Sequence, residues 1–147
     1  MKRHSKAEQI ERLTTMENRV AFWRYCIKAA FAAQERAKKK GVPFSIDAYY
    51  LEQLMVDQGW RCALSDIPFS VKRRDPFGPS LDRIVPSLGY VAGNLRFVNH
   101  ILNTAMSNWG IEIVLQVAKA VADKNRTRPE PLLKKCTKAK KINSEIK

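Results

Sequence analysis

The pattern of hydrophobic and polar residues predicts a long helix near the start of the chain. Over residues 7–39, apolar side chains recur at intervals of three and four, which is the period of one helix face. The members of this apolar stripe are Ile10, Leu13, Met16, Val20, Trp23, Ile27, Ala30 and Phe31. We expect the stripe to face the core of the protein. Gly41 and Pro43 are typical of a helix end.

A second helix is predicted over residues 46–58. Ser45 is its expected N-cap, and Asp47 lies in the first turn, where a carboxylate is favourable. Its expected inner face consists of Ile46, Tyr50, Leu51 and Leu54. Gly59 follows as a stop signal.

The middle of the chain alternates short apolar pieces with polar loops. These pieces predict a short extended segment with a turn at Ser65-Asp66, a second short strand, and then a short helix. The predicted elements are an extended segment at 61–71, a loop at 72–79, a strand at 80–85, a loop at 86–94 and a helix at about 97–106. The order is therefore strand, loop, strand, loop, helix.

The last part of the chain contains one more predicted helix and a basic tail. Residues 111–123 are apolar enough for a helix that is mostly buried. Beyond Lys124 the chain is rich in lysine with little periodicity, which is typical of a flexible tail. The prediction is an α+β protein divided into a basic N-terminal helix at 1–42, a core at 43–123 and a tail at 124–147.

The distribution of charge indicates a polyanionic partner. The 147 residues include 27 Lys and Arg against 14 Asp and Glu, for a net charge of +13. Residues 1–42 and 124–147 each carry +7, whereas residues 43–123 carry −1. Two basic flanks around a nearly neutral body favour nucleic acid as the partner, although such flanks can also serve only to keep a protein soluble.

Several classes of protein are not expected. No apolar run approaches the roughly 18 residues of a membrane span, and the N-terminus lacks the apolar region of a secretion signal. We therefore expect a soluble intracellular protein with no membrane partner. The three cysteines, Cys26, Cys62 and Cys136, form no CxxC pair, and only His4 and His100 could add ligands, so neither a structural zinc site nor a disulfide scaffold is expected.

Asp82 and Asn103 are the candidate metal ligands. If the predicted helix packs back across the strands, their side chains can converge. A carboxylate and an amide oxygen suit Mg²⁺, which keeps several waters and takes further oxygen ligands from a phosphate. In a basic protein this pair is the minimum for metal-assisted phosphodiester hydrolysis. Both residue types are also common in purely structural roles.

The segment GWRCALSDIPFS…PSLDRIVPSLGYVAGNLRFVNHILNTAMS resembles the HNH endonuclease superfamily, whose domain has the ββα-metal (His-Me finger) fold. It is most similar to a phage and restriction-type branch. The positions that carry the resemblance are Asp82-Arg83, Gly89-Tyr90, Asn94-Leu95-Arg96 and Asn103. The resemblance extends over roughly residues 46–123.

The resemblance implies a role for each matched residue. Asp82 and Asn103 would be the metal ligands, and Asn94 would brace the loop of the active site. Arg83 stands where most of these enzymes have a general-base histidine, so the letters H-N-H are R-N-N here. With oxygen ligands only, Mg²⁺ or Mn²⁺ is the expected cofactor.

The missing histidine leaves two candidates for the general base. Arginine stays protonated and suits phosphate neutralisation, which is the expected role of Arg83. Tyr90 matches a tyrosine proposed to activate the nucleophile in related enzymes. His100 precedes Asn103 by three residues, and imidazole titrates near neutral pH. A packing role for Tyr90 and a DNA-contact or packing role for His100 remain open.

The predicted function is a divalent-metal-dependent endonuclease acting on DNA, most simply duplex DNA. The residues expected to contact DNA are Arg96, Lys72, Arg73, Arg74, Lys38, Lys39 and Lys40. One alternative is a non-catalytic nucleic-acid-binding protein on the same scaffold, and another is a structure-specific or RNA-directed nuclease. The resemblance implies a cytoplasmic location in a bacterium or a phage-infected host cell. Nicking or double-strand cleavage, and a monomer or a homodimer, are all compatible with the sequence.

Overall fold

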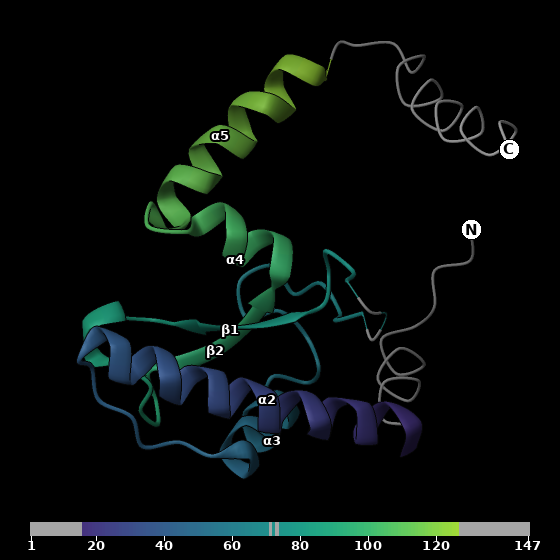
Figure 1. The fold of residues 1–147 in the computed structure, drawn as a ribbon. Coiled ribbons are helices and arrows are strands. Elements are labelled where there is room, and N and C mark those ends of the chain that lie inside the picture. The colour runs from purple at the N-terminus through teal and green to yellow at the C-terminus, as the bar shows by residue number, and fades with distance from the viewer. Residues whose placement is uncertain (1–15, 71, 73, 127–147) are drawn as a thin grey trace, which may run out of the picture. The chain divides into compact units, whose positions relative to one another are not determined.

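The computed structural model describes residues 16–70, 72 and 74–126, and their arrangement is α+β, as predicted (Figure 1). The elements are α2 (Met16–Lys40), α3 (Ala48–Asp57), β1 (Pro79–Arg83), the 3-10 helix η1 (Pro86–Leu88), β2 (Leu95–Asn99), α4 (His100–Met106) and α5 (Gly110–Asn125). These residues fall into two compact units that divide after Ala105. The candidate site residues belong to the first unit.

The buried face of α2 is not the one that the sequence pattern indicates. Three members of the predicted stripe, Val20, Ile27 and Phe31, are 47%, 49% and 66% exposed. The buried members of the helix are Phe22, Cys26, Ala33 and Ala37. The prediction is wrong because it weighted large apolar side chains, whereas three of the four buried side chains are small. The predicted positions before residue 16 lie outside the described residues.

Helix α3 begins two residues later than predicted, because Asp47 and not Ser45 is its N-cap. The Asp47 carboxylate accepts a hydrogen bond of 2.8 Å from the backbone N–H of Tyr50, an N–H that the first helical turn leaves without a partner. The inner face is shifted accordingly, and Leu51 and Met55 are its fully buried residues. Gly59 follows the helix with a φ of +60°.

The sheet is a two-stranded antiparallel hairpin of β1 and β2. Asp82 pairs with Arg96, and Leu81 pairs with Phe97. The predicted strand at 80–85 is therefore confirmed with a small shift. The predicted helix at 97–106 is wrong in its first turn, because residues 95–99 are a strand and the helix starts at His100.

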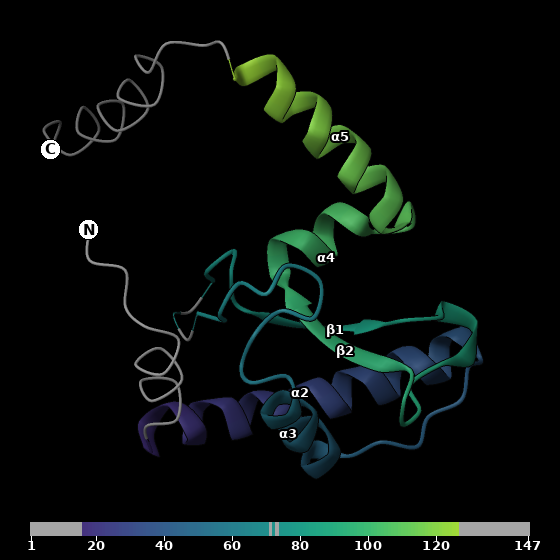
Figure 2. The same ribbon diagram turned by 180° about the vertical axis from the view of Figure 1, so that it is seen from behind.

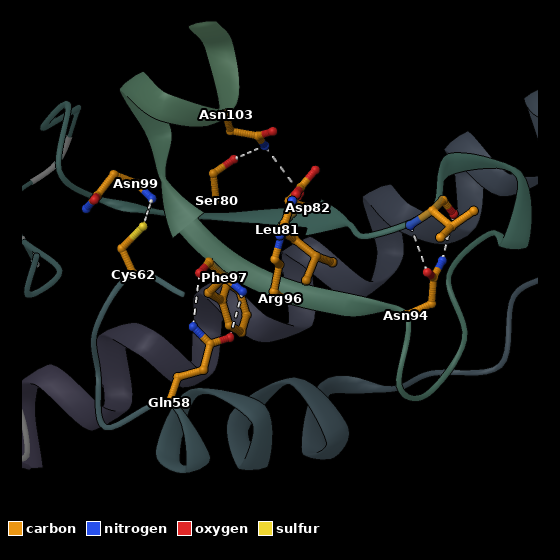
Figure 3. Close-up of polar contacts among 11 residues, drawn as sticks. Gln58, Cys62, Ser80, Leu81, Asp82, Asn94, Arg96, Phe97, Asn99 and Asn103 are labelled. Carbon is orange, nitrogen blue, oxygen red and sulfur yellow. Dashed lines mark hydrogen bonds and ion pairs between the residues drawn. The ribbon is translucent and has the colours of Figure 1, made fainter. Parts of the chain in front are cut away.

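The segment at 61–71, predicted as the first strand, makes only an isolated bridge between Arg61 and Pro68. It forms no strand among the residues described, so Asp82 lies on the first strand of the sheet and not on the second. The edge of β2 that does not pair with β1 contacts Gln58 instead. The side-chain oxygen of Gln58 accepts a hydrogen bond of 2.8 Å from the N–H of Phe97, and its side-chain nitrogen donates one of 3.0 Å to the Phe97 carbonyl (Figure 3). This contact blocks further strand pairing at that edge.

The two faces of the hairpin have different neighbours. Side chains alternate along a strand, so Leu81, Leu95 and Phe97 share one face. Helix α2 lies along this face in both views (Figures 1 and 2), and its Phe22 ring packs against Phe97 at 5.9 Å between ring centroids. Ser80 and Asp82 therefore project from the opposite face, which α4 approaches.

The remaining described elements add little to the core. Helix α5 has no buried residue, so the prediction of a mostly buried last helix is wrong; Leu115 and Val117 are 60% and 56% exposed. None of the described helices has the length and apolar character needed to cross a membrane. The predicted flexible tail beyond residue 126 lies outside the described residues.

Candidate active site

Asp82 and Asn103 lie on the same side of the hairpin, contributed by β1 and α4 (Figure 3). The side-chain amide nitrogen of Asn103 donates hydrogen bonds to Ser80 Oγ at 2.8 Å and to the carbonyl oxygen of Leu81 at 3.4 Å. These contacts attach α4 to the two residues that immediately precede Asp82 in β1. The side chains of Asp82 and Asn103 therefore extend from β1 and α4 on the same side of the hairpin, as the sequence predicts.

The hydrogen bonds also determine which way the Asn103 amide points. The Leu81 carbonyl can only accept, so the atom that faces it must be the amide nitrogen. Within the described residues, the Asn103 Oδ1 atom has no hydrogen-bond partner and neither does Asp82 Oδ1. The other carboxylate oxygen, Asp82 Oδ2, accepts from Arg96 Nε at 2.8 Å.

These two oxygens fit a hard divalent cation that keeps most of its water shell. One carboxylate and one amide oxygen are too few for a closed protein cage, but they suit Mg²⁺ or Mn²⁺ with waters and substrate phosphate in the other positions. No group of three or more His, Cys, Asp or Glu residues suited to a metal occurs in the part of the chain that the structure describes. The candidate site is therefore this pair alone.

Asn94 connects the two ends of the loop between the strands. Its side-chain oxygen accepts from the N–H of Val85 at 2.9 Å, and its amide nitrogen donates to the Val85 carbonyl at 2.9 Å (Figure 3). The amide nitrogen also donates to the carbonyl of Gly89 at 2.8 Å. Asn94 is 5% exposed; its bond to Gly89 is buried and its two bonds to Val85 are partly buried. These bonds link the two ends of the loop to each other.

Gly89 brings this loop against the segment that precedes α3. Its φ is +75°, and a Cβ at this position would lie 2.3 Å from the Pro43 carbonyl oxygen. The close approach allows two backbone hydrogen bonds, from the N–H of Tyr90 to Pro43 O at 2.8 Å and from the N–H of Ser45 to Tyr90 O at 2.9 Å. Tyr90 is fixed by these bonds and is 4% exposed.

The Tyr90 ring lies close to two guanidinium groups. The centre of the Arg83 guanidinium is 4.9 Å from the ring centroid, and that of Arg36 is 5.7 Å away. Arg36 Nε also donates a hydrogen bond of 3.0 Å to the Tyr90 hydroxyl. Arg83 follows Asp82 directly, but alternation along β1 places its side chain on the α2 face, next to Tyr90, whereas Asp82 projects from the opposite face and pairs with Arg96. The candidate residues therefore form two clusters on opposite faces of the hairpin.

Arg36 is a site residue that the sequence reasoning missed. It lies near the end of a basic helix, 54 residues before Tyr90, and nothing in the local pattern distinguishes it from the neighbouring cations. The available signal was weak: Arg36 is one turn before the end of α2, next to the buried Ala37. A second tyrosine, Tyr25, also contacts β1 through Leu81, but burial raises its pKa to about 12, which makes it a poor base.

His100, the other candidate for the general base, is the first residue of α4 and is exposed. His100 lines a cavity of about 450 Å³ together with Phe22, Tyr25 and Trp60, and the lining includes neither Asp82 nor Asn103. Among the predicted DNA-contact residues, Lys72 and Arg74 also line this cavity. Their neighbour Arg73 lies outside the described residues.

The other predicted DNA-contact residues belong to the end of α2 and to β2. Lys38, Lys39 and Lys40 form the last turn of α2 and are exposed, with Lys38 paired to Glu35 at 3.2 Å. In both views this end of α2 lies beside the loop between the strands (Figures 1 and 2). Arg96 is held by Asp82 and is therefore part of the candidate site itself.

Comparison of the chain with models of protein families, with curated proteins and with solved structures finds no match.

Proposed function

We propose that this protein is a divalent-metal-dependent endonuclease that hydrolyses phosphodiester bonds in DNA on a ββα-metal core. The observation that carries the proposal is the position of Asn103. Its amide nitrogen is bound to Ser80 and Leu81, and among the described residues its oxygen has no hydrogen-bond partner, on the side of the hairpin that bears the Asp82 carboxylate. The order β1, β2, α4 supports the same scaffold, because a hairpin followed by a helix supplies both ligands.

The residues of the two clusters have complementary proposed roles. Asp82 and Asn103 hold the cation, which when bound polarises the phosphate and acidifies water. Arg83 and Arg36 offer two guanidinium groups to the phosphate, whose charge they neutralise. Asn94 holds the loop that follows Arg83.

Tyr90 is the proposed proton acceptor. It contacts Arg83, the residue next to Asp82, whereas His100 lines a separate cavity. The Tyr90 hydroxyl already accepts a hydrogen bond from Arg36 and has a further lone pair. The proposed role of His100 is a contact to DNA.

The charge around the site supports a nucleic-acid substrate. The basic end of α2 lies beside the loop that follows Arg83, so these lysines are close to the cluster of Arg83, Tyr90 and Arg36. Such clustering of cations attracts a phosphate backbone without reading its sequence. Duplex DNA is the proposed substrate.

One observation favours the alternative of a non-catalytic nucleic-acid-binding protein. Asp82 is already neutralised by Arg96 in this structure, and a scaffold without metal needs such an internal counter-ion. In that case the protein would bind DNA through its basic residues and leave it intact.

Incubation of the protein with supercoiled plasmid separates the two functions. With Mg²⁺ or Mn²⁺ we expect conversion to open-circular or linear DNA, and with excess chelator we expect none. Retarded migration without any cleavage, at every metal tested, would support the binding protein instead.

The basic tail is expected to contribute affinity and not chemistry. If the whole protein neutralises about 6 phosphates, the slope of log K against log salt is near −5. Deletion of residues 127–147, which carry seven basic and two acidic side chains, should make the slope flatter by about 2 and leave the cleavage rate at saturating protein unchanged. Fluorescence anisotropy of a labelled duplex at several salt concentrations measures the slope; an unchanged slope would show that the tail does not contact DNA.

A further inference from the structure

Arg96 forms an ion pair with Asp82, the carboxylate of the candidate metal site. Its Nε donates to Asp82 Oδ2 at 2.8 Å, and the two residues are direct partners in the register of β1 and β2. Their side chains are 23% and 17% exposed, so water screens the pair less than it screens an ion pair on the open surface. A cation that binds Asp82 must therefore compete with a cation that is already present.

The contact between the two side chains is a single one. Only Nε of Arg96 donates to Asp82, and within the described residues the two Nη groups of Arg96 make no hydrogen bond, although a guanidinium can bind a carboxylate through two parallel bonds. Asn103, the other ligand, is held by two hydrogen bonds. Arg96 is thus the easily displaced part of the site, and Asn103 is the fixed part.

We propose that Arg96 is a displaceable counter-ion that keeps the site closed to the cation until nucleic acid binds. This inference rests on the proposed function. Arg96 pairs with Asp82 in the free protein and lowers its affinity for divalent cations. A phosphate group offers the guanidinium an alternative partner with the bidentate geometry that it lacks on Asp82. Nucleic acid and cation therefore bind cooperatively, because each favours the state in which the Arg96–Asp82 pair is broken.

Titration with Mn²⁺ alone, followed by isothermal calorimetry, tests the counter-ion role. Removal of the positive charge in Arg96→Gln should tighten Mn²⁺ binding roughly tenfold, because the competing cation is gone. Arg96→Lys keeps the charge and should stay within about twofold of the wild type. Arg24→Gln removes the same charge from an exposed position of α2 and is the control for net charge. Circular dichroism and a thermal melt establish that each variant is folded.

The outcomes separate this inference from the proposed function. Unchanged or weaker Mn²⁺ binding in Arg96→Gln, with binding still lost in Asp82→Asn, would overturn the counter-ion role and leave the metal site intact. Mn²⁺ binding that Asp82→Asn does not affect would show that the site itself is wrong. Equal tightening in Arg96→Gln and Arg24→Gln would reduce the effect to net charge and also overturn the inference.

The Mn²⁺ titration is repeated in the presence of a short DNA duplex whose phosphodiester linkages resist hydrolysis. This experiment tests the cooperativity between nucleic acid and cation. In the wild type we expect the duplex to tighten Mn²⁺ binding by about tenfold, which is a typical coupling between two sites. In Arg96→Gln the enhancement should fall to about twofold or less, because no ion pair remains to be broken. An equal enhancement in both proteins would contradict the coupling through Arg96.

Discussion

Asp82→Asn is expected to reduce metal-dependent DNA cleavage by roughly a thousandfold. The substitution keeps the shape of the side chain but removes the only charged ligand of the proposed site. A bound metal ion supplies several kcal/mol of transition-state stabilisation, and each 1.36 kcal/mol corresponds to a tenfold change in rate. Initial rates of plasmid cleavage at saturating Mg²⁺ measure the loss, and a mobility shift with the same DNA should show binding within about threefold of the wild type.

The matched control is Asp66→Asn. Asp66 also forms an ion pair with an arginine, at 2.7 Å to Arg61 Nε, and lies in the same unit as Asp82. Its φ of +53° is one that asparagine tolerates well, so the fold should be preserved. The control should cleave within about twofold of the wild type. Cleavage by Asp82→Asn at the rate of this control would show that the metal site is not at Asp82.

The placement of Asp82 and Asn103, the candidate ligands, on one side of the hairpin could be predicted from sequence because it depends on the local order of the elements. The sequence pattern predicts a strand at 80–85, a loop with two glycines and a following helix. This order of elements is sufficient to direct Asp82 and Asn103 to one face of the hairpin. The exact boundary was not readable. Residues 95–99 contain apolar side chains that fit a helix or a strand, and the hydrogen bonds that favour the strand come from β1 and from Gln58, 39 residues away from Phe97.

The face that α2 buries shows a second limit of the sequence pattern. The helix has an aliphatic and aromatic stripe, which the period favours, and a second stripe of small residues. Cys26, Ala33 and Ala37 are buried at 0%, 0% and 2% exposure, because small side chains let a neighbouring backbone come close. On hydrophobicity alone, Phe31 is a better candidate for burial than Ala33. The shape of the surface against which α2 packs reverses this order.

The contacts of Tyr90 could not be derived from local sequence at all. Gly89-Tyr90 is recognisable as a turn, but the partner of the glycine is the Pro43 carbonyl and the partner of the hydroxyl is Arg36. Both lie more than 40 residues earlier, Arg36 in the basic flank at 1–42 and Pro43 at the first position of the predicted core. The flank is instead in contact with the core, and Tyr90 joins Arg36 of the flank to Arg83 of β1.

Gly89→Ala is therefore expected to destabilise the protein strongly and to disturb the site. A left-handed φ costs an alanine about 1–2 kcal/mol. The new Cβ would also lie 2.3 Å from Pro43 O and 2.8 Å from Pro43 N, and these are backbone atoms that cannot rotate away. Moving the loop outward breaks the backbone hydrogen bonds of Tyr90, so we expect a total loss of about 3–5 kcal/mol in the free energy of unfolding. Urea denaturation followed by tryptophan fluorescence measures it.

Gly93→Ala separates the cost of the clash from the cost of the backbone angle. Gly93 lies in the same loop with a φ of +79°, and no heavy atom lies within 4 Å of a Cβ built there. Its only expected cost is the left-handed φ, about 1–2 kcal/mol. The two variants should differ by at least about 2 kcal/mol, and only Gly89→Ala should lose cleavage under conditions where both are folded, because only that change displaces Tyr90 from Arg36 and Arg83. Equal stability losses would mean that the loop can move away from Pro43 freely, and the link between the basic helix and the site would then be incidental.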